Sequence, residues 1–200
     1  VIQDLQDSFA EQSGVRVLAY GQGGFRQVIG NVAVNSLADM HGMKVRVPES
    51  DIYIDTFSAL GANPTPLAYS ETFTALQQGT VDAFEITPAV VLSAGFWEVC
   101  SDMNMTNHLF SPNPLMISEN LFQSLTEEQQ DILTEAAAKA AADQRQWLED
   151  GEADTMAQLE EKGMTINYPD LEELQNAVAD SGLYEKYQET IGADLFSAVQ

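Results

Sequence analysis

Arginine is the scarce residue type in this sequence, and its positions indicate where chemistry could take place. The chain has 8 Lys and Arg residues against 31 Asp and Glu residues, and its formal net charge is −23. Arg46 follows Val45 in an alternating segment that ends at Pro48. A guanidinium at the carboxyl end of a strand can hold a carboxylate through two parallel hydrogen bonds, which the ammonium group of lysine does less well. Arg46 is therefore either an anion-binding residue or the partner of one of the chain's many carboxylates.

Arg26 has the same two interpretations. It follows the glycine-rich segment 21–24 and the aromatic residue Phe25. Two arginines in the first part of a chain so poor in cations favour an anion site. The overall negative charge would repel an anionic ligand at long range, so recognition must depend on short-range contacts.

The sequence contains no recognisable catalytic signature. Segment 21–24 fails the dinucleotide-binding pattern because Arg26 stands where the third glycine belongs. Phosphate-binding loops, nucleophile elbows and zinc-protease motifs are absent, and His41 and His108 are too far apart in sequence to indicate a metal pair. Carboxylates are so frequent that a pair of them is no evidence for acid–base catalysis. We therefore expect no catalytic residue, no metal site and no cofactor.

The charge balance excludes further classes of function. A nucleic-acid-binding surface needs basic residues that displace counterions, and a polybasic membrane contact needs a cluster of them. No apolar run reaches the roughly 18 residues of a membrane-spanning helix. Dispersed carboxylates are typical of a solvated, repulsive surface that stays soluble in salty surroundings. We expect a soluble chain with no nucleic-acid partner and no direct insertion into a membrane.

The elements that must position the arginines alternate between strands and helices. The expected strands are 15–20, 43–48, 82–86 and 164–168, and residues 21–24 are expected as a loop. The expected helices are 2–12, 37–41, 51–60, 70–79, 88–99 and 126–162, followed by two closing helices. Strands that alternate with helices in this way indicate an α/β protein with a mainly parallel sheet.

Residues 126–162 predict an unusually long helix. The segment contains no proline and one glycine, Gly151, and it begins with the spacing of a capping box and ends before Gly163. At 1.5 Å per residue the helix would span roughly 55 Å, which is more than the width of a small domain. We expect a continuous strut that crosses two domains; the alternative is a break at Gly151.

Four segments together resemble the DctP-type solute-binding proteins of TRAP transporters, and the similarity extends through essentially the whole chain. They are GMKVRVPES at 42–50, FSALGANPTP at 57–66, ETFTALQQGTVDAFE at 71–85 and TNH at 106–108. In that family two α/β domains close on a small organic acid, and a long helix crosses both domains. The resemblance implies this periplasmic-binding-protein-like architecture and a periplasmic location.

The resemblance also implies a domain assignment. Residues 24–110 plus 152–200 would form the second α/β ligand-binding domain. Residues 1–23 plus 111–151 would supply a remnant of the first domain, the hinge strands and the long connecting helix. Family members carry a signal peptide and most of the first domain before the position of Val1. We therefore expect the chain to be a fragment that holds half of a ligand pocket.

Individual site residues follow from the resemblance as expectations. Arg46 matches the family's arginine that grips the ligand carboxylate, and Arg26 matches a second pocket arginine. Tyr69 stands where an aromatic ring packs on the ligand, with core packing as the alternative. Many family members carry an asparagine that binds the carboxylate at the position of Ile86. Because isoleucine donates no hydrogen bond, the change suggests a different or more apolar ligand.

One further pair is a hypothesis of its own. Glu85 and His108 are expected at the ends of two neighbouring strands. There they would form a pair that senses closure of the domains. The alternative is that both side chains face solvent.

The resulting functional expectation is an extracytoplasmic solute-binding protein without catalysis. It would capture a small carboxylate ligand and deliver it to the membrane permease subunits of a TRAP transporter, acting as a monomer. The alternative is a ligand-sensing receptor module of the same fold that signals to a membrane partner. The residues leave the identity of the organic acid open, because sugar acids, dicarboxylates, keto acids and aromatic acids all carry the group that Arg46 would hold.

Overall fold

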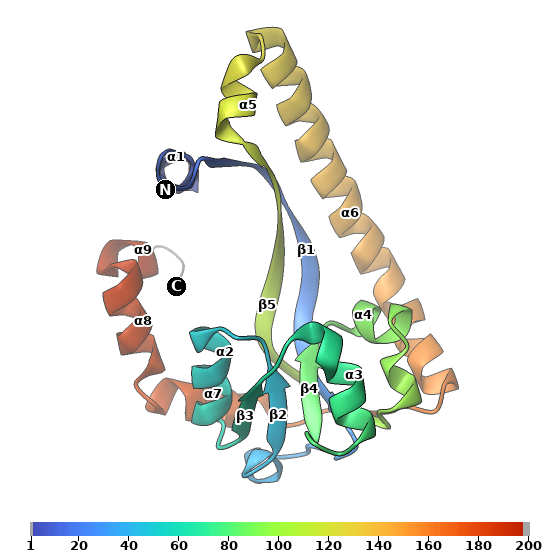
Figure 1. Cartoon of the computed structure of the whole chain (residues 1–200). Coiled ribbons are helices and arrows are strands. Elements are labelled where there is room, and N and C mark those ends of the chain that lie inside the picture. Colours follow the sequence, from blue (N-terminus) through green and yellow to red (C-terminus); the bar gives the residue numbers. More distant parts are fainter. Residues whose placement is uncertain (1, 198–200) are drawn as a thin grey trace. The chain divides into compact units, whose positions relative to one another are not determined.

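The chain divides into two compact units in the computed structural model, which describes residues 2–197 (Figure 1). Unit 2 comprises Phe25–Phe110 and Glu152–Ala193, and the other described residues belong to unit 1. Three long elements contribute residues to both units, as does the short helix at residues 193–197: they are the strands β1 (Val15–Gly30) and β5 (Asp102–Ser118) and the helix α6 (Glu127–Glu161). All of the candidate site residues lie in unit 2, which is therefore the unit that positions the site.

Unit 2 is built on a six-stranded sheet with the strand order β3-β2-β4-β1-β5-β6. Its short strands are β2 (Lys44–Val47), β3 (Asn63–Pro66), β4 (Ala83–Ile86) and β6 (Thr165–Asn167). β2 runs parallel to β3 and β4, β5 runs parallel to β6, and β1 runs antiparallel to β4. The expected α/β class is confirmed, and the sheet is mixed because of β1.

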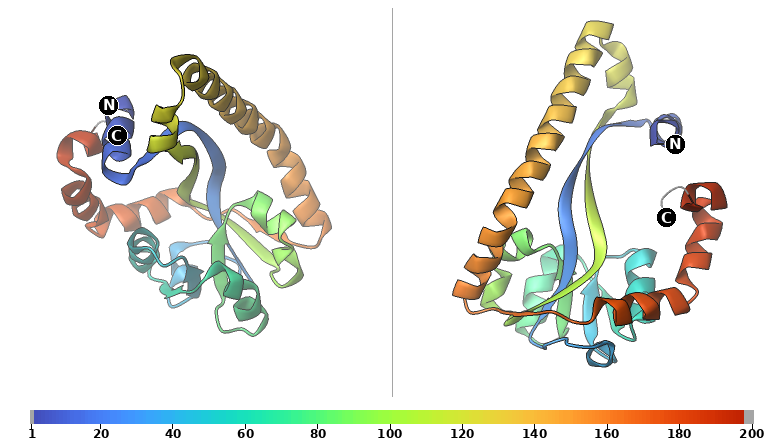
Figure 2. Two further views of the ribbon diagram at one scale, coloured as in Figure 1. Left: turned by 45° about the horizontal axis from the view of Figure 1, so that its top comes forward. Right: turned by 180° about the vertical axis from the view of Figure 1, so that it is seen from behind.

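Helices cover both faces of this sheet (Figure 1; Figure 2). The first face carries η1 (Leu37–Met40), α2 (Asp51–Ala59) and α7 (Leu171–Asp180), with α8 (Leu183–Ile191) in contact with α2 and α7. The second face carries α3 (Tyr69–Gln77), α4 (Pro88–Ser93), η2 (Phe96–Glu98) and the end of α6. Local sequence explains such helix starts: the side chain of Asp170 accepts hydrogen bonds from two backbone N–H groups at the beginning of α7.

Side-chain alternation along the strands separates two apolar cores. Val45 and Ala83 belong to the core under α2 and α7, whereas Ile29 and Phe84 belong to the core under α3 and α4. Successive residues of a strand point to opposite faces. Arg46, which is paired in register with Phe84, therefore projects to the second face.

Unit 1 contains α1 (Ile2–Ser13), α5 (Glu119–Ser124) and its parts of β1, β5 and α6. The short helix α9 (Ala193–Ser197) begins with the last residue of unit 2, and its other residues belong to unit 1. Arg16 holds β1 to α5, because its Nε and Nη2 atoms donate to the two carboxylate oxygens of Glu119 at 2.6 and 2.8 Å. Its guanidinium also lies 4.9 Å from the ring centre of Phe122. Arg16 is thus paired with a carboxylate of the chain, which is the alternative interpretation given above for Arg46 and Arg26.

The expectation of a loop at residues 21–24 is wrong, because β1 continues through them. The glycine at position 21 serves close packing: a Cβ there would lie 2.6 Å from Oε1 of Gln144 on α6. That oxygen accepts the backbone N–H of Gln22 at 2.9 Å, and Nε2 of Gln144 donates to the carbonyl of Gln22 at 2.8 Å. The missing side chain thus lets a strand and a helix exchange two hydrogen bonds.

Two other expectations need correction. The helix expected at 88–99 ends with α4 at Ser93, because Gly95 adopts a left-handed conformation with φ of 75° before the 3₁₀ turn η2. The strand β3 was not expected, since it contains Pro64 and Pro66. Prolines are tolerated there because β3 is an edge strand of the sheet.

The long helix is confirmed, and it passes through Gly151 without a break. Ala137 and Ala141 are its buried residues in unit 1, so small side chains allow close packing at that face. No atom lies within 4 Å of the place where a Cβ of Gly151 would stand. Among the helices of residues 2–197, none is both long and apolar enough to cross a membrane.

Candidate functional site

The candidate site lies where three parallel strands of unit 2 end. Arg46 is near the carboxyl end of β2, Glu85 is near the carboxyl end of β4, and Leu67 directly follows β3. Parallel strands bring their carboxyl ends to the same edge of a sheet, which is where ligands bind in open α/β folds. The fold therefore gathers residues from three distant parts of the sequence at one edge.

Arg46 is buried but lacks a carboxylate partner. Its residue is 3% exposed, and its Nε and Nη2 atoms donate to the carbonyl oxygen of Leu67 at 3.0 and 2.7 Å. None of the ion pairs within residues 2–197 includes Arg46. Burial lowers the pKa of Arg46; the negative charge of Glu85 opposes this effect, and the positive charge of Arg26 adds to it by less. An arginine remains charged under these conditions, so the site holds a cation whose hydrogen-bond acceptor in the described chain is a backbone carbonyl and not a carboxylate.

One end of the Arg46 guanidinium is open. The Nη1 atom makes no hydrogen bond within the described chain, although every fully buried polar side-chain atom there has a partner. Nη1 must therefore reach solvent. Because the carbonyl of Leu67 occupies the Nε side, the guanidinium presents its Nη1–Nη2 end outward, with the geometry that suits two parallel bonds to a carboxylate.

Arg26 is neutralised by a buried carboxylate. It is 8% exposed, and Glu85 is fully buried. Nη2 of Arg26 donates to Oε1 of Glu85 at 2.7 Å and to its backbone carbonyl at 3.0 Å, while Nε bonds to Oε2. The guanidinium also lies 5.3 Å from the ring centre of Tyr53. Burial favours a lower pKa for Arg26, but the hydrogen bonds and charge of Glu85 outweigh it and raise the pKa.

His108 completes this buried cluster. Its Nε2 lies 3.4 Å from Oε2 of Glu85, and its Nδ1 lies 2.8 Å from Oγ1 of Thr106. The ring stands edge-on to Phe57 at 4.9 Å between centres. Burial lowers the pKa of His108 more than the contact with Glu85 raises it, so the imidazole is neutral at pH 7. A neutral ring with its proton on Nε2 donates to Glu85 and accepts from the hydroxyl of Thr106.

The structure corrects the description of the Glu85–His108 pair. The two residues do not lie on neighbouring strands, because β1 lies between β4 and β5 in the sheet. They do not face solvent either, since the side chain of His108 is 3% exposed and that of Glu85 is fully buried. Their long side chains meet on the first face of the sheet, under the aromatic rings of α2.

Tyr69 and Ile86 belong to the other face. Tyr69 is the first residue of α3, is 47% exposed, and packs edge-on against Phe96 at 6.0 Å between ring centres. It also acts electrostatically on Arg46, where it raises the pKa slightly against the effect of burial. Ile86 is half-buried against the second core. It stands two residues beyond Phe84, the register partner of Arg46, so it is a diagonal neighbour of Arg46 on the same face.

The six predicted site residues therefore form two groups. Arg26, Glu85 and His108 share the first face, whereas Arg46, Tyr69 and Ile86 share the second. Sequence reasoning missed the carbonyl of Leu67 and the ring of Tyr53, which orient the two arginines. No side-chain signal marks a carbonyl acceptor, and Thr106 was visible only as part of the TNH motif.

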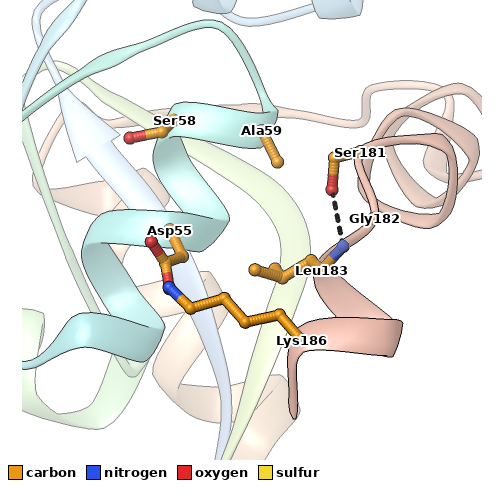
Figure 3. Close-up of a pocket in the computed structure, with 7 residues that line it drawn as sticks. All are labelled: Asp55, Ser58, Ala59, Ser181, Gly182, Leu183 and Lys186. Atoms are coloured by element: carbon orange, nitrogen blue, oxygen red, sulfur yellow. Dashed lines mark hydrogen bonds and ion pairs between the residues drawn. The ribbon is translucent and has the colours of Figure 1, made fainter. Parts of the chain in front are cut away.

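A hollow elsewhere in unit 2 does not involve these residues. It has a volume of about 370 Å³ and lies between α2 and the turn that joins α7 to α8 (Figure 3). Its charged lining residues, Asp55 and Lys186, are bonded to each other across it. Ser181 is likewise bonded to the backbone N–H of Leu183 at 3.3 Å. The two charged groups are thus paired with each other, and Ser181 is bonded within its own turn.

Comparison with known proteins gives consistent results. Residues 1–190 match the family described as bacterial extracellular solute-binding protein, family 7, DctP. A solute-binding protein of Roseobacter denitrificans is 38% identical over 181 residues, which are 90% of this chain and 56% of that protein. The sialic acid-binding periplasmic protein SiaP of Vibrio cholerae is 30% identical over 195 residues, which are 98% of this chain and 60% of that protein.

Solved structures agree with the sequence relatives. A TRAP periplasmic solute-binding protein of Roseobacter denitrificans with bound L-galactonate superposes with a TM-score of 0.85 at 36% identity, covering 97% of this chain and 65% of that one. Another from Bordetella bronchiseptica, with density assigned as pantoate, has a TM-score of 0.90 at 30% identity, covering 98% and 65%. The chain thus spans less than two thirds of the length of these proteins.

Proposed function

Because this chain belongs to the DctP family, family 7 of the bacterial extracellular solute-binding proteins, we propose that its protein captures a small organic acid in the periplasm and delivers it to the permease subunits of a TRAP transporter. The relative from Vibrio cholerae is named for sialic acid, and the two solved structures hold L-galactonate and a ligand assigned as pantoate. All three are carboxylic acids. The protein would release its ligand chemically unchanged, without a catalytic step, and would act as a monomer.

The observation that carries this proposal is the open end of Arg46. A buried guanidinium that is held by a carbonyl, with no carboxylate partner in the described chain, has one unsatisfied end directed to solvent. A ligand carboxylate would supply two charge-assisted hydrogen bonds there. The same bonds would compensate the charge that burial now disfavours.

The other predicted residues receive supporting roles in the proposal. Tyr69 offers an exposed ring on the same face of the sheet as Arg46, on which a ligand would pack. Arg26 would influence the ligand through its positive charge and not through direct contact, because its guanidinium donates its hydrogen bonds to Glu85. The cluster of Glu85 and His108 would respond to domain closure. The hydrogen bonds of a buried polar network are favourable only while all its side chains keep their positions.

We also propose a domain assignment. Residues 24–110 plus 152–200 would be the second, ligand-binding domain of the full-length protein. Residues 1–23 plus 111–151 would be the remnant of the first domain with the hinge strands and the connecting helix. The division of the chain after positions 24, 110 and 151 supports most of this assignment, whereas the described residues after Ala193 fall in unit 1.

A thermal-shift screen of the full-length protein against organic acids tests the proposal. Ligands that bind the native state raise the melting temperature by mass action. We expect at least one carboxylate to raise the melting temperature of the natural protein and of Arg145→Ala, a control that removes a positive charge from unit 1. The same acid should not change the melting temperature of the Arg46→Ala variant. A carboxylate that stabilises Arg46→Ala equally well would contradict the proposal, as would conversion of the bound acid into another compound.

A further inference from the structure

The strand β5 contains one residue in an unusual backbone conformation, Asn107. Its φ is 46°, and among the described residues it is the one non-glycine residue with a positive φ. Asparagine tolerates this left-handed region better than most residues do. A left-handed residue inside a strand is typical of a bulge, which redirects the side chains next to it. The side chains next to Asn107 are those of Thr106 and His108, and both are buried.

Gln27 of β1 holds Asn107 through two hydrogen bonds. Its Nε2 atom donates to Oδ1 of Asn107 at 2.7 Å, and its Oε1 atom accepts the backbone N–H of Asn107 at 3.0 Å. Gln27 is itself fixed, because Nε2 also donates to the carbonyl of Phe25 at 3.2 Å and the residue is 2% exposed. We call Gln27 and Asn107 the amide pair. Since it bonds both the main chain and the side chain of the left-handed residue, it holds this part of β5 in one conformation.

The amide pair lies next to the buried cluster of the first face along both strands. Gln27 follows Arg26 on β1, and Asn107 precedes His108 on β5. Successive residues of a strand point to opposite faces, so Gln27 lies on the second face while Arg26 lies on the first. A rotation of the backbone at Asn107 would therefore move the ring of His108 on the other face of the sheet.

The contacts of His108 need a fixed ring position. Its Nδ1 lies 2.8 Å from Oγ1 of Thr106, whereas its Nε2 lies 3.4 Å from Oε2 of Glu85. The second distance is long for a hydrogen bond, so a small displacement of the ring would break it. The charged groups that act on the ring are Glu85 from β4 and Arg26 from β1, and α2 adds the uncharged ring of Phe57. An imidazole that moved toward water would bind a proton more readily.

We propose that the amide pair positions the imidazole of His108 against Glu85 and Thr106 by holding β5 in its left-handed conformation at Asn107. Gln27 and Asn107 are positioning residues, because they act through the backbone beside the ring. The consequence is an uncharged ring beside an arginine that its own carboxylate neutralises. The inference goes beyond the proposed function and does not depend on it, since it holds whether or not an acid binds.

Nuclear magnetic resonance of the histidine rings in the full-length protein tests this proposal. Long-range proton–nitrogen correlation spectra report which imidazole nitrogen carries the proton and at which pH the ring titrates. The signals that disappear in His108→Gln identify those of His108. In the natural protein, His108 should carry its proton on Nε2 and titrate below about 6.5, the ordinary value for histidine. In Gln27→Leu, which removes the amide, the ring should titrate closer to about 6.5 and populate both tautomers.

Asn107→Gly and Asn107→Asp form a matched pair of variants. Glycine adopts a positive φ freely but removes the acceptor of Gln27, so the titration of His108 should shift as it does in Gln27→Leu. Aspartate keeps an acceptor oxygen and replaces the Nδ2 atom, which makes no hydrogen bond within the described part of the chain. Asn107→Asp should therefore keep the Nε2 proton of the natural protein.

Two outcomes would overturn the proposal. The first is an unchanged tautomer and titration of His108 in folded Gln27→Leu and Asn107→Gly proteins, even if both unfold more easily, because lost stability alone is what a purely structural pair would show. The second is a mixture of tautomers in Asn107→Asp. Circular dichroism establishes folding, and Asn107 is exposed, so its variants decide the question if Gln27→Leu does not fold.

Discussion

Each face of the sheet in unit 2 holds one buried arginine, and the two arginines differ in their hydrogen-bond acceptors. On the first face, Arg26 is bonded to a fully buried carboxylate that also contacts a neutral histidine. On the second face, Arg46 is even less exposed, yet it is held by a backbone carbonyl and has no carboxylate partner in the described chain. Burial alone therefore does not tell whether a buried arginine has a carboxylate partner within the chain. The identity of its hydrogen-bond acceptor does.

The largest expected effect comes from removing the carboxylate of the first face. Glu85→Ala leaves Arg26 charged, buried and unpaired, and should lower the free energy of unfolding by about 3–5 kcal/mol. Arg46→Met is the matched change on the second face. It deprives only the carbonyl of Leu67 of its partner and should cost about 1–2 kcal/mol. Urea unfolding of both variants provides the measurement, and equal costs would remove the distinction between the two faces.

A smaller effect concerns the histidine of the first face. The folded chain lowers the pKa of His108, so the unfolded chain binds its proton more readily. Stability should therefore fall as the pH drops through about 6.5, the ordinary value for histidine, toward the lower folded pKa. The groups that face this ring are Glu85, Arg26 and Thr106.

His108→Gln isolates this effect. Between pH 7 and pH 5.5, the natural protein should lose about 1 kcal/mol more stability than the variant does. Urea unfolding at several pH values measures the difference. Parallel curves for the two proteins would show that the imidazole does not titrate differently on folding.

The smallest effect is expected from an exposed pair at the hollow between α2 and α8. The side chain of Lys186 is 56% exposed, and its partner Asp55 also accepts a hydrogen bond from the hydroxyl of Tyr187 at 2.9 Å. Because solvent screens this pair, Lys186→Met should change the free energy of unfolding by less than about 0.5 kcal/mol. Thermal or urea unfolding suffices as a readout. A cost comparable to that of Glu85→Ala would mean that exposure does not separate weak ion pairs from strong ones here.

Much of the fold could be predicted from local sequence signals. Alternation of apolar residues marked β2 and β4, and the absence of proline marked α6. The elements that were predicted wrongly depend on contacts with distant parts of the chain, which a short segment of sequence does not reveal. The strand β3 tolerates prolines because it lies at the sheet edge, and residues 21–24 remain extended because glycine there admits Gln144 of α6.

The candidate site was predictable only in part. The alternating segment around Arg46 predicted a strand, and the structure places Arg46 near the carboxyl end of β2. Its role in ligand binding stays a prediction. The separation of Arg26 and Arg46 onto opposite faces depends on the register between β1, β4 and β2, which the sequence does not state. The role of Leu67 was invisible because a backbone carbonyl is the same in every residue.

The exchange between Gln22 and Gln144 has a consequence for how this chain can evolve. A methyl group at position 21 would force the amide of Gln144 to withdraw, and both main-chain groups of Gln22 would then lose their partners. Either change by itself is penalised, whereas a larger residue at 21 together with a shorter one at 144 removes the clash. Positions 21 and 144 should therefore covary across lineages as a pair, although more than a hundred positions separate them in the sequence.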